Sequence, residues 1–269
     1  MKTPIIVAAF GTTSRSRAVY ETVHVHLKRR FAGHPIQWAF TSRFVRARLQ
    51  GADLPSPGEA VRRLADQGHR WAVVQSFHMI CGHEFHRLVQ EVQHPACRVS
   101  MGHSLLCRPE DHRAVAEALA PVFALDESEA VVLVGHGTDH CSWSAYPAFG
   151  FRLREMYGPR AFVGVIEGGW PDREALVGRI VESGFRRARL VPFLLVAGVH
   201  FREDLAGSED SWKTVLEARG VRVALETEAL GSRPSILDIF AQHMGQALEA
   251  IPDTETRQSL SHPGRVQVP

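Results

Sequence analysis

Short apolar runs alternate with amphipathic stretches along almost the whole chain, and this alternation limits the fold more than any other feature. The runs are nearly continuous in apolar residues, as is typical of parallel strands buried on both faces. Parallel strands need long crossovers, usually helical, and the amphipathic stretches supply them. We therefore expect an α/β fold. The strands are expected at Ile5–Phe10, Ile36–Phe40, Ala72–Phe77, Val99–Met101, Ala130–Val134, Phe162–Ile166, Leu190–Leu195 and Val221–Leu225, and the helices at Ala18–Arg30, Gly58–Gln67, Pro109–Phe123, Asp172–Ser183, Ser211–Arg219 and Ile236–Glu249.

The two halves of the sequence resemble each other. Val7 to Thr12 is similar to Leu133 to Thr138, and Val74 to His83 is similar to Val191 to His200. The repeat predicts two similar halves, each a parallel four-stranded sheet flanked by helices, facing each other across a cleft. We expect an N-terminal half at residues 1–126, a C-terminal half at 127–251 and a flexible polar tail at 252–269.

Charge and hydropathy exclude several classes of protein. A formal net charge of +2 argues against a nucleic-acid binder. No segment approaches the ~20 apolar residues that span a bilayer, and the start of the chain lacks the pattern of a secretory signal. The four cysteines form no CxxC pair and are expected to be reduced thiols. We therefore expect a cytoplasmic protein.

Three residues that could bind a metal each follow a predicted strand. His136, Glu167 and His200 are separated by 31 and 33 residues, and each interval is about the ~30 residues of one strand–helix unit. The carboxyl ends of parallel strands share one edge of a sheet, where ligands bind. We therefore expect the two imidazoles and the carboxylate to converge there, as ligands of a first-row divalent metal.

Each of the three also has a plainer interpretation when it is considered alone. A histidine after a strand is often structural, and Glu167 could simply begin the next helix, where a carboxylate suits the positive dipole. The repeat offers an internal comparison. At the equivalent positions the first half has Phe10, Thr41 and His83, so only the second half carries the full set.

A second group of polar residues follows the predicted strands of the first half. His78, His83, Glu84 and His86 come after the third strand, where an exposed histidine-rich loop is the alternative to a functional role. His140 is near His136 and could support it. Thr12, before a helix, is a candidate for anion binding at the helix N-terminus, and Arg15 and Arg43 are candidates for pairing with ligand carboxylates.

These segments resemble the class II tetrapyrrole metal chelatases, specifically the anaerobic sirohydrochlorin cobaltochelatases of the CbiK family. The resemblance extends to Glu249 and is most specific from His200 to Lys213, including Asp204 and Trp212. The other matching segments are Phe10-Gly11-Thr12, Phe40-Thr41-Ser42, Val74-Gln75-Ser76-Phe77-His78, Gly135-His136-Gly137, Val165-Ile166-Glu167 with Pro171, and Leu194-Leu195-Val196-Ala197-Gly198-Val199-His200.

The resemblance implies two α/β halves around a tetrapyrrole and an enzyme of the lyase class. Its reaction would insert Co²⁺ into sirohydrochlorin and release two protons, in anaerobic cobalamin biosynthesis. His136, Glu167 and His200 would bind the metal, and His136 would accept protons together with Glu167 or Glu84. The residues expected to contact the tetrapyrrole are Phe10, Thr12, Arg15, Arg43, His78 and His83.

Three points stay open at this stage. Fe²⁺ or Ni²⁺ could replace Co²⁺ as the metal substrate, because imidazole and carboxylate accept all three; with iron the enzyme would be a ferrochelatase for sirohaem. A non-catalytic protein that binds haem or metal is the alternative from another class, with His78 as the nearest position for a haem ligand. A homo-oligomer is expected, and no nucleic-acid or membrane partner.

Overall fold

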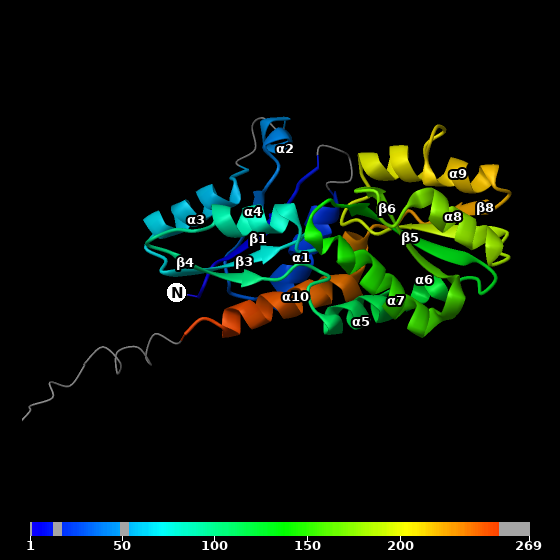
Figure 1. Ribbon diagram of the computed structural model, residues 1–269. Helices are drawn as coiled ribbons and strands as arrows, with labels where there is room; N and C mark the ends of the chain where they lie inside the picture. Colours follow the sequence, from blue (N-terminus) through cyan, green and yellow to red (C-terminus); the bar gives the residue numbers. More distant parts are fainter. Residues whose placement is uncertain (1, 13–17, 49–53, 253–269) are drawn as a thin grey trace, which may run out of the picture.

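The computed structural model describes residues 2–12, 18–48 and 54–252, and it contains two parallel four-stranded sheets (Figure 1). The first sheet has the order β2-β1-β3-β4 and the second the order β6-β5-β7-β8, which is the same topology. The predicted fold class of two similar α/β halves is confirmed. The strands are β1 (Ile5–Ala9), β2 (Ile36–Phe40), β3 (Trp71–Ser76), β4 (Arg98–Gly102), β5 (Ala130–Gly137), β6 (Ala161–Glu167), β7 (Arg187–Pro192) and β8 (Arg222–Leu225).

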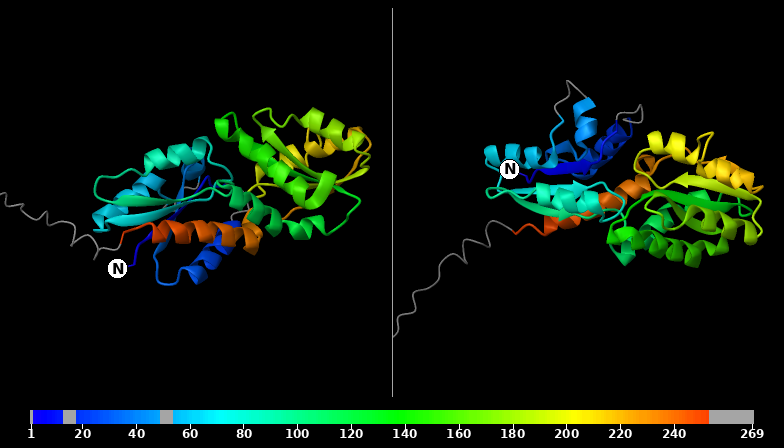
Figure 2. Two further views of the ribbon diagram at one scale, coloured as in Figure 1. Left: turned by 60° about the horizontal axis from the view of Figure 1, so that its bottom comes forward. Right: turned by 45° about the horizontal axis from the view of Figure 1, so that its top comes forward.

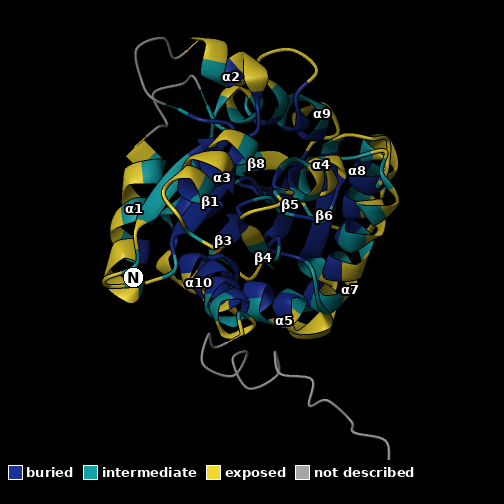
Figure 3. Ribbon diagram, turned by 90° about the vertical axis from the view of Figure 1, so that its left-hand side faces the viewer, coloured by how far each residue is buried: buried dark blue, intermediate teal, exposed yellow. Residues whose placement is uncertain are grey.

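Helices cover both faces of each sheet, so that the strands form the buried interior and the outer faces of the helices are exposed (Figure 3). Several helices begin at side chains that accept backbone N–H bonds, such as Ser56, Asp172 and Ser211. The helices are α1 (Ala18–Arg30), α2 (Arg43–Arg48), α3 (Pro57–Asp66), α4 (His83–Glu91), α5 (Pro109–Ala118), α6 (Ala120–Phe123), α7 (Ala145–Tyr157), α8 (Arg173–Glu182), α9 (Trp212–Ala218) and α10 (Pro234–Glu249).

The helices differ from the sequence predictions at four places. The single helix expected at Pro109–Phe123 is two helices, because Pro121 has no backbone N–H with which to continue the hydrogen bonding of the first. Helices α2, α4 and α7 were not predicted. The histidine-rich segment at His83 is thus the first turn of α4 rather than an exposed loop. The predicted tail lies outside the described residues from position 253 onward.

One helix from the C-terminal part of each half packs against the other half. Helix α10 follows β8 in the sequence, but it packs against strands β3 and β4 of the first sheet and against helix α1. Figure 2 shows α10 and α1 side by side. Helix α5 follows β4 but packs on α7 of the second half. The predicted boundary between the halves, at residues 126 and 127, remains a prediction from the sequence repeat. Helices α5 and α10 each pack against elements on the other side of this boundary.

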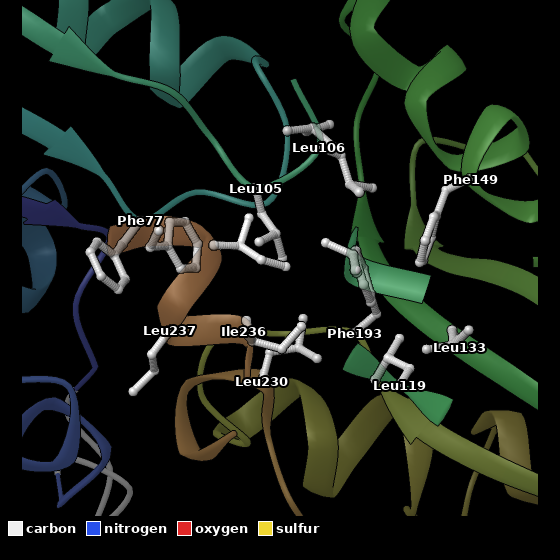
Figure 4. Close-up of a cluster of buried hydrophobic side chains, with 14 of the residues drawn as sticks. Phe77, Leu105, Leu106, Leu119, Leu133, Phe149, Phe193, Leu230, Ile236 and Leu237 are labelled. Atoms are coloured by element: carbon white, nitrogen blue, oxygen red, sulfur yellow. The ribbon is translucent and has the colours of Figure 1, made fainter. Parts of the chain in front are cut away.

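One apolar cluster joins the two halves as a result of this exchange. Figure 4 shows Phe77 and Leu105 of the first half, Ile236 of α10, and Phe149 and Phe193 of the second half in one continuous region. All five side chains are buried. Within the described residues no helix is long and apolar enough to cross a bilayer.

A buried polar contact links the two exchanged helices. His243 of α10 and Asp111 of α5 are 2.8 Å apart from ring Nε2 to carboxylate Oδ1. Burial disfavours the Asp111 carboxylate, but hydrogen bonds from His243 and Arg108 outweigh it and lower the pKa of Asp111 from 3.8 to about 2. The ionised form is therefore the one that the fold stabilises.

This pKa shift predicts an acid-sensitive contribution to stability. A carboxyl whose pKa is lower in the folded state stabilises the fold above its unfolded pKa and loses that contribution as the pH falls through its folded pKa. Between pH 4 and pH 2 the wild type should lose about 2 kcal/mol of unfolding free energy through Asp111. Urea unfolding across this range should show a smaller loss for Asp111→Asn, whereas Asp66→Asn, at an exposed position of α3, should match the wild type. Equal losses in all three proteins would contradict the assignment.

Candidate functional site

His136, Glu167 and His200 converge at the carboxyl edge of the second sheet. One ligand atom of each lies within 4.8 Å of those of the other two, which makes them the one such group found among the described residues. Nδ1 of His136 is 3.9 Å from Oε2 of Glu167, and the rings of His136 and His200 are 4.7 Å apart and nearly perpendicular. The three side chains are 46%, 59% and 44% exposed, in that order, so an ion could reach them from solvent.

The strand order explains this convergence. Strand β6 lies on one side of β5, and the next strand in the sequence, β7, lies on its other side. The crevice between β5 and β7 is therefore the topological switch point, where ligands bind in sheets of this kind. His136 stands near the end of β5 and Glu167 at the end of β6, where Gly137 and Glu167 are register partners. His200 arrives from the segment that follows β7. Three strands thus deliver one side chain each.

The backbone beside His136 is tightly packed. Gly137 has a φ of 88°, and a Cβ there would lie 1.9 Å from the carbonyl oxygen of Glu167, so only glycine fits between the two strands. The backbone N–H of Gly137 donates to the hydroxyl of Tyr146, at 3.1 Å. Tyr146 is buried on α7, and burial raises its pKa, which keeps the phenol neutral. The end of β5 that carries His136 is therefore fixed from both sides.

His200 is oriented by a carboxylate one turn further along the chain. It directly precedes a short π-helical segment, η4 (Phe201–Leu205), and its Nδ1 is 2.9 Å from Oδ2 of Asp204. A carboxylate only accepts hydrogen bonds, so Nδ1 is the donor, and in the neutral form of the ring Nε2 has the free lone pair. This is the usual arrangement around histidines that bind metals in proteins. The sequence signal for Asp204 was its i+4 spacing from His200, but it was not among the predicted site residues.

The segment after η4 is held in place by further contacts. Arg173 of α8 bonds both the backbone and the carboxylate of Asp210, and Ser211 caps α9 through the backbone N–H of Thr214. Trp212 is buried against Gly164 of β6, where a Cβ would overlap the indole ring. The stretch with the most specific family resemblance thus anchors the His200 segment to the sheet.

Four predicted residues of the first half belong to the segments that follow β1 and β2. Phe10 follows β1 and is 52% exposed, and Arg43 begins α2 with an exposed side chain. Thr12 lies in the loop after β1, and Arg15 lies outside the described residues. At the position equivalent to Glu167, Thr41 is buried. Within the described part of the first half, no equivalent group of three ligands forms.

His78 and Glu84 are two predicted residues with unusual surroundings. Nδ1 of His78 is 2.9 Å from the hydroxyl of Ser76, while its Nε2 is buried without a hydrogen-bond partner. Burial lowers the pKa of His78 to about 4, although the nearby Glu84 opposes this, so the ring is neutral near pH 7. One oxygen of Glu84 bonds Arg87 at 2.8 Å, and the other is buried without a partner.

His83 connects the carboxyl edges of the two sheets. Its Nε2 is 2.9 Å from Oδ1 of Asp139, and its ring lies 4.8 Å from that of His140, which also contacts His86 at 4.8 Å. His83 and His86 belong to α4, after β3, whereas Asp139 and His140 follow β5. The candidate metal group therefore lies beside the place where the two halves meet at their carboxyl ends.

This donor set suits an ion that must enter and leave. Two imidazoles and one carboxylate match the preferences of Co²⁺, Fe²⁺ and Ni²⁺. The set lacks the four closed ligands of a structural zinc site, and its side chains are half-exposed. His136 is also near a carboxylate, as expected of a group that accepts protons.

Comparison with known proteins gives a consistent family. The model of the protein family described as Cobalt chelatase (CbiK) matches residues 3–249 of this chain. The sirohydrochlorin cobaltochelatase of Salmonella typhimurium (strain LT2) is 31% identical over 258 residues, covering 92% of this chain and 97% of that protein. Sirohydrochlorin cobaltochelatase CbiKC of Nitratidesulfovibrio vulgaris (strain Hildenborough) is 32% identical over 265 residues, covering 94% and 93%.

A solved structure supports the fold independently. SirB from Bacillus subtilis with Fe³⁺ superposes with a TM-score of 0.67 at 18% identity, covering 92% of this chain and 96% of that one. At this identity the likeness speaks for the architecture alone. The match over residues 3–249 and the two relatives above 30% identity decide the family. This chain belongs to the CbiK family of cobalt chelatases.

Proposed function

We propose that this protein is a sirohydrochlorin cobaltochelatase, which inserts Co²⁺ into sirohydrochlorin and releases two protons. Family membership and relatives of that name across nearly the whole chain support the activity. The observation that carries the proposal for this chain's own residues is the convergence of His136, Glu167 and His200 within 4.8 Å. A cytoplasmic location and a homo-oligomeric state stay predictions from the sequence.

The reaction needs a group that presents the ion and a base that removes protons. His136, Glu167 and His200 hold Co²⁺ at the edge of the second sheet, with coordination positions left for the pyrrole nitrogens. Once the ion has passed to the macrocycle, the freed ring nitrogen of His136 accepts a proton from a pyrrole N–H, and Glu167 or Glu84 receives the second. The half-exposure of the three ligands lets the protein give up the ion.

The first half supplies contacts to the macrocycle in this proposal. Phe10 offers an exposed aromatic face, and Arg43 offers a cation for the carboxylates of sirohydrochlorin. His83, at the start of α4, contacts His140 in the loop that follows His136, and His78 lies near Glu84 of the same helix. Haem binding through His78 is not part of the proposal, since the ring nitrogen that would bind iron is buried.

The proposed activity is tested by incubating the purified protein anaerobically with sirohydrochlorin and Co²⁺, Fe²⁺ or Ni²⁺ and following the absorption spectrum. We expect insertion of all three ions above the uncatalysed rate, with Co²⁺ fastest. Faster insertion of Fe²⁺ would make the protein a ferrochelatase for sirohaem. Binding of metal or haem without any insertion would favour the non-catalytic alternative and overturn the proposal.

Replacing the proposed base should separate chemistry from folding. His136→Ala should lower the rate of Co²⁺ insertion by at least ~100-fold, because the variant loses a metal ligand and a proton acceptor together. Its far-UV circular dichroism should match the wild type, since the side chain is half-exposed. His94→Ala is the control, because His94 follows α4 at the opposite edge of the first sheet. Unchanged turnover of His136→Ala would contradict its role.

The partner of His200 should tune metal affinity without touching the ion. Asp204→Asn removes the carboxylate that fixes the tautomer of His200, and we expect Co²⁺ to bind about 10- to 100-fold more weakly. Titration calorimetry of the protein with Co²⁺ alone measures this directly. Glu203→Gln is a matched control, since Glu203 is an exposed carboxylate of the same segment. Equal affinities of the two variants would show that Asp204 does not support His200.

A further inference from the structure

Two cysteines of the first half lie side by side on adjacent chain segments. Ile80 and Leu106 form a parallel bridge between the segments that follow β3 and β4, and the backbone N–H of Leu106 donates to the carbonyl of Met79 at 2.8 Å. Cys81 and Cys107 each come one residue after this bridge. Their sulfur atoms are 3.4 Å apart.

This geometry is compatible with a covalent bond between the two sulfurs. Neighbouring parallel segments run ~4.8 Å apart, within the ~4.4–6.8 Å of Cα separation that disulfides accept. Bond formation therefore requires rotation of side chains rather than movement of the backbone. Cys81 and Cys107 are both half-buried thiols, so a small oxidant can reach them, whereas Cys97 is fully buried.

The surroundings of the pair distinguish a nucleophile from its partner. Hydrogen bonds from the Cys107 thiol and from the hydroxyl and backbone N–H of Ser104 outweigh burial and lower the pKa of Cys81 to about 6. The pKa of Cys107 is raised by the same contact with Cys81 and by burial. Near pH 7 Cys81 is thus the thiolate and Cys107 the thiol, which is the arrangement of an attacking and a resolving cysteine.

We propose that Cys81 and Cys107 form a reversible disulfide by exchange with a low-molecular-weight disulfide. The Cys81 thiolate attacks one sulfur of the small disulfide, forms a mixed disulfide and releases one small thiolate. Cys107 then loses its proton and attacks the sulfur of Cys81, which releases the second small thiolate. The two protein thiols are oxidised, and the small disulfide is reduced to two thiols, which take up the protons.

The Cys81–Cys107 disulfide would affect His78 and Glu84, which the proposed function places near the macrocycle. The Ser104 hydroxyl is 3.2 Å from that of Ser76, which in turn bonds Nδ1 of His78. Oxidation removes the thiolate that Ser104 bonds, and it fixes Cys81 three residues before Glu84. This part rests on the proposed function, and we expect the oxidised protein to insert Co²⁺ about tenfold more slowly, as for other losses of supporting contacts.

The test uses Cys141→Ser as the parent, because Cys141 is the exposed thiol and lies outside the pair. The parent is treated with oxidised glutathione, and its free thiols are titrated under denaturing conditions. We expect the count to fall from three to one without dimer formation, with peptide mapping placing the bond between Cys81 and Cys107. A dithiol should restore all three thiols.

Two further variants of the parent test the order of attack. Cys107→Ser should accumulate a mixed disulfide with glutathione at Cys81, whereas Cys81→Ser should react far more slowly and form no internal bond. Three persistent thiols in the treated parent, or equal reactivity of the two variants, would overturn the proposed disulfide chemistry.

The effect on insertion is measured separately. A tenfold slower, dithiol-reversible Co²⁺ insertion in the oxidised parent supports control by the disulfide, and an unchanged rate overturns it. A reduced parent that inserts no metal would instead refute the proposed function, and the thiol titration would still decide whether the disulfide forms.

Discussion

The arrangement of the site depends on the exchange of helices α5 and α10 between the two halves. A four-stranded sheet with one uncovered face could not bury that face alone, and here α10 covers the first sheet although it belongs by sequence to the second half. The apolar cluster that results is continuous from Phe77, stacked 4.2 Å from Phe240 of α10, to Phe149 and Phe193 of the second half. Because this cluster is shared, the carboxyl edges of the two sheets are held beside each other, and the contact between His83 and Asp139 spans them.

The repeat is symmetric in fold and asymmetric in chemistry. Both sheets have the same strand order and therefore the same kind of switch point. In the second half this point carries His136, Glu167 and His200, while in the first half the positions equivalent to His136 and Glu167 hold an exposed phenylalanine and a buried threonine. In the proposed function, one switch point holds the ion and the other contacts the macrocycle.

The sequence was sufficient for features that follow from local pattern and topology. All eight strands were predicted within a few residues, because buried parallel strands are apolar along their whole length. The convergence of His136, Glu167 and His200 was also predictable, since parallel strands share an edge. The exchange of α5 and α10 was not predictable, because the apolar face of an amphipathic helix does not indicate which sheet the helix will pack against. The same limit applies to Tyr146 and to the Cys81–Cys107 contact, which depend on how distant segments pack.

The geometry of the candidate metal group reflects two opposing requirements. A site that binds a divalent ion tightly uses many ligands in a closed shell, whereas a chelatase must pass the ion to its product. In the proposed function, the half-exposure of the three candidate ligands serves the second requirement. Precision is then recovered outside the ligand set: Asp204 fixes the tautomer of His200, and Gly137 with Tyr146 fixes the end of β5 beside His136. In the proposed function, rigid support around few ligands would orient the ion without retaining it, so these neighbouring residues matter to that function as much as the candidate ligands do.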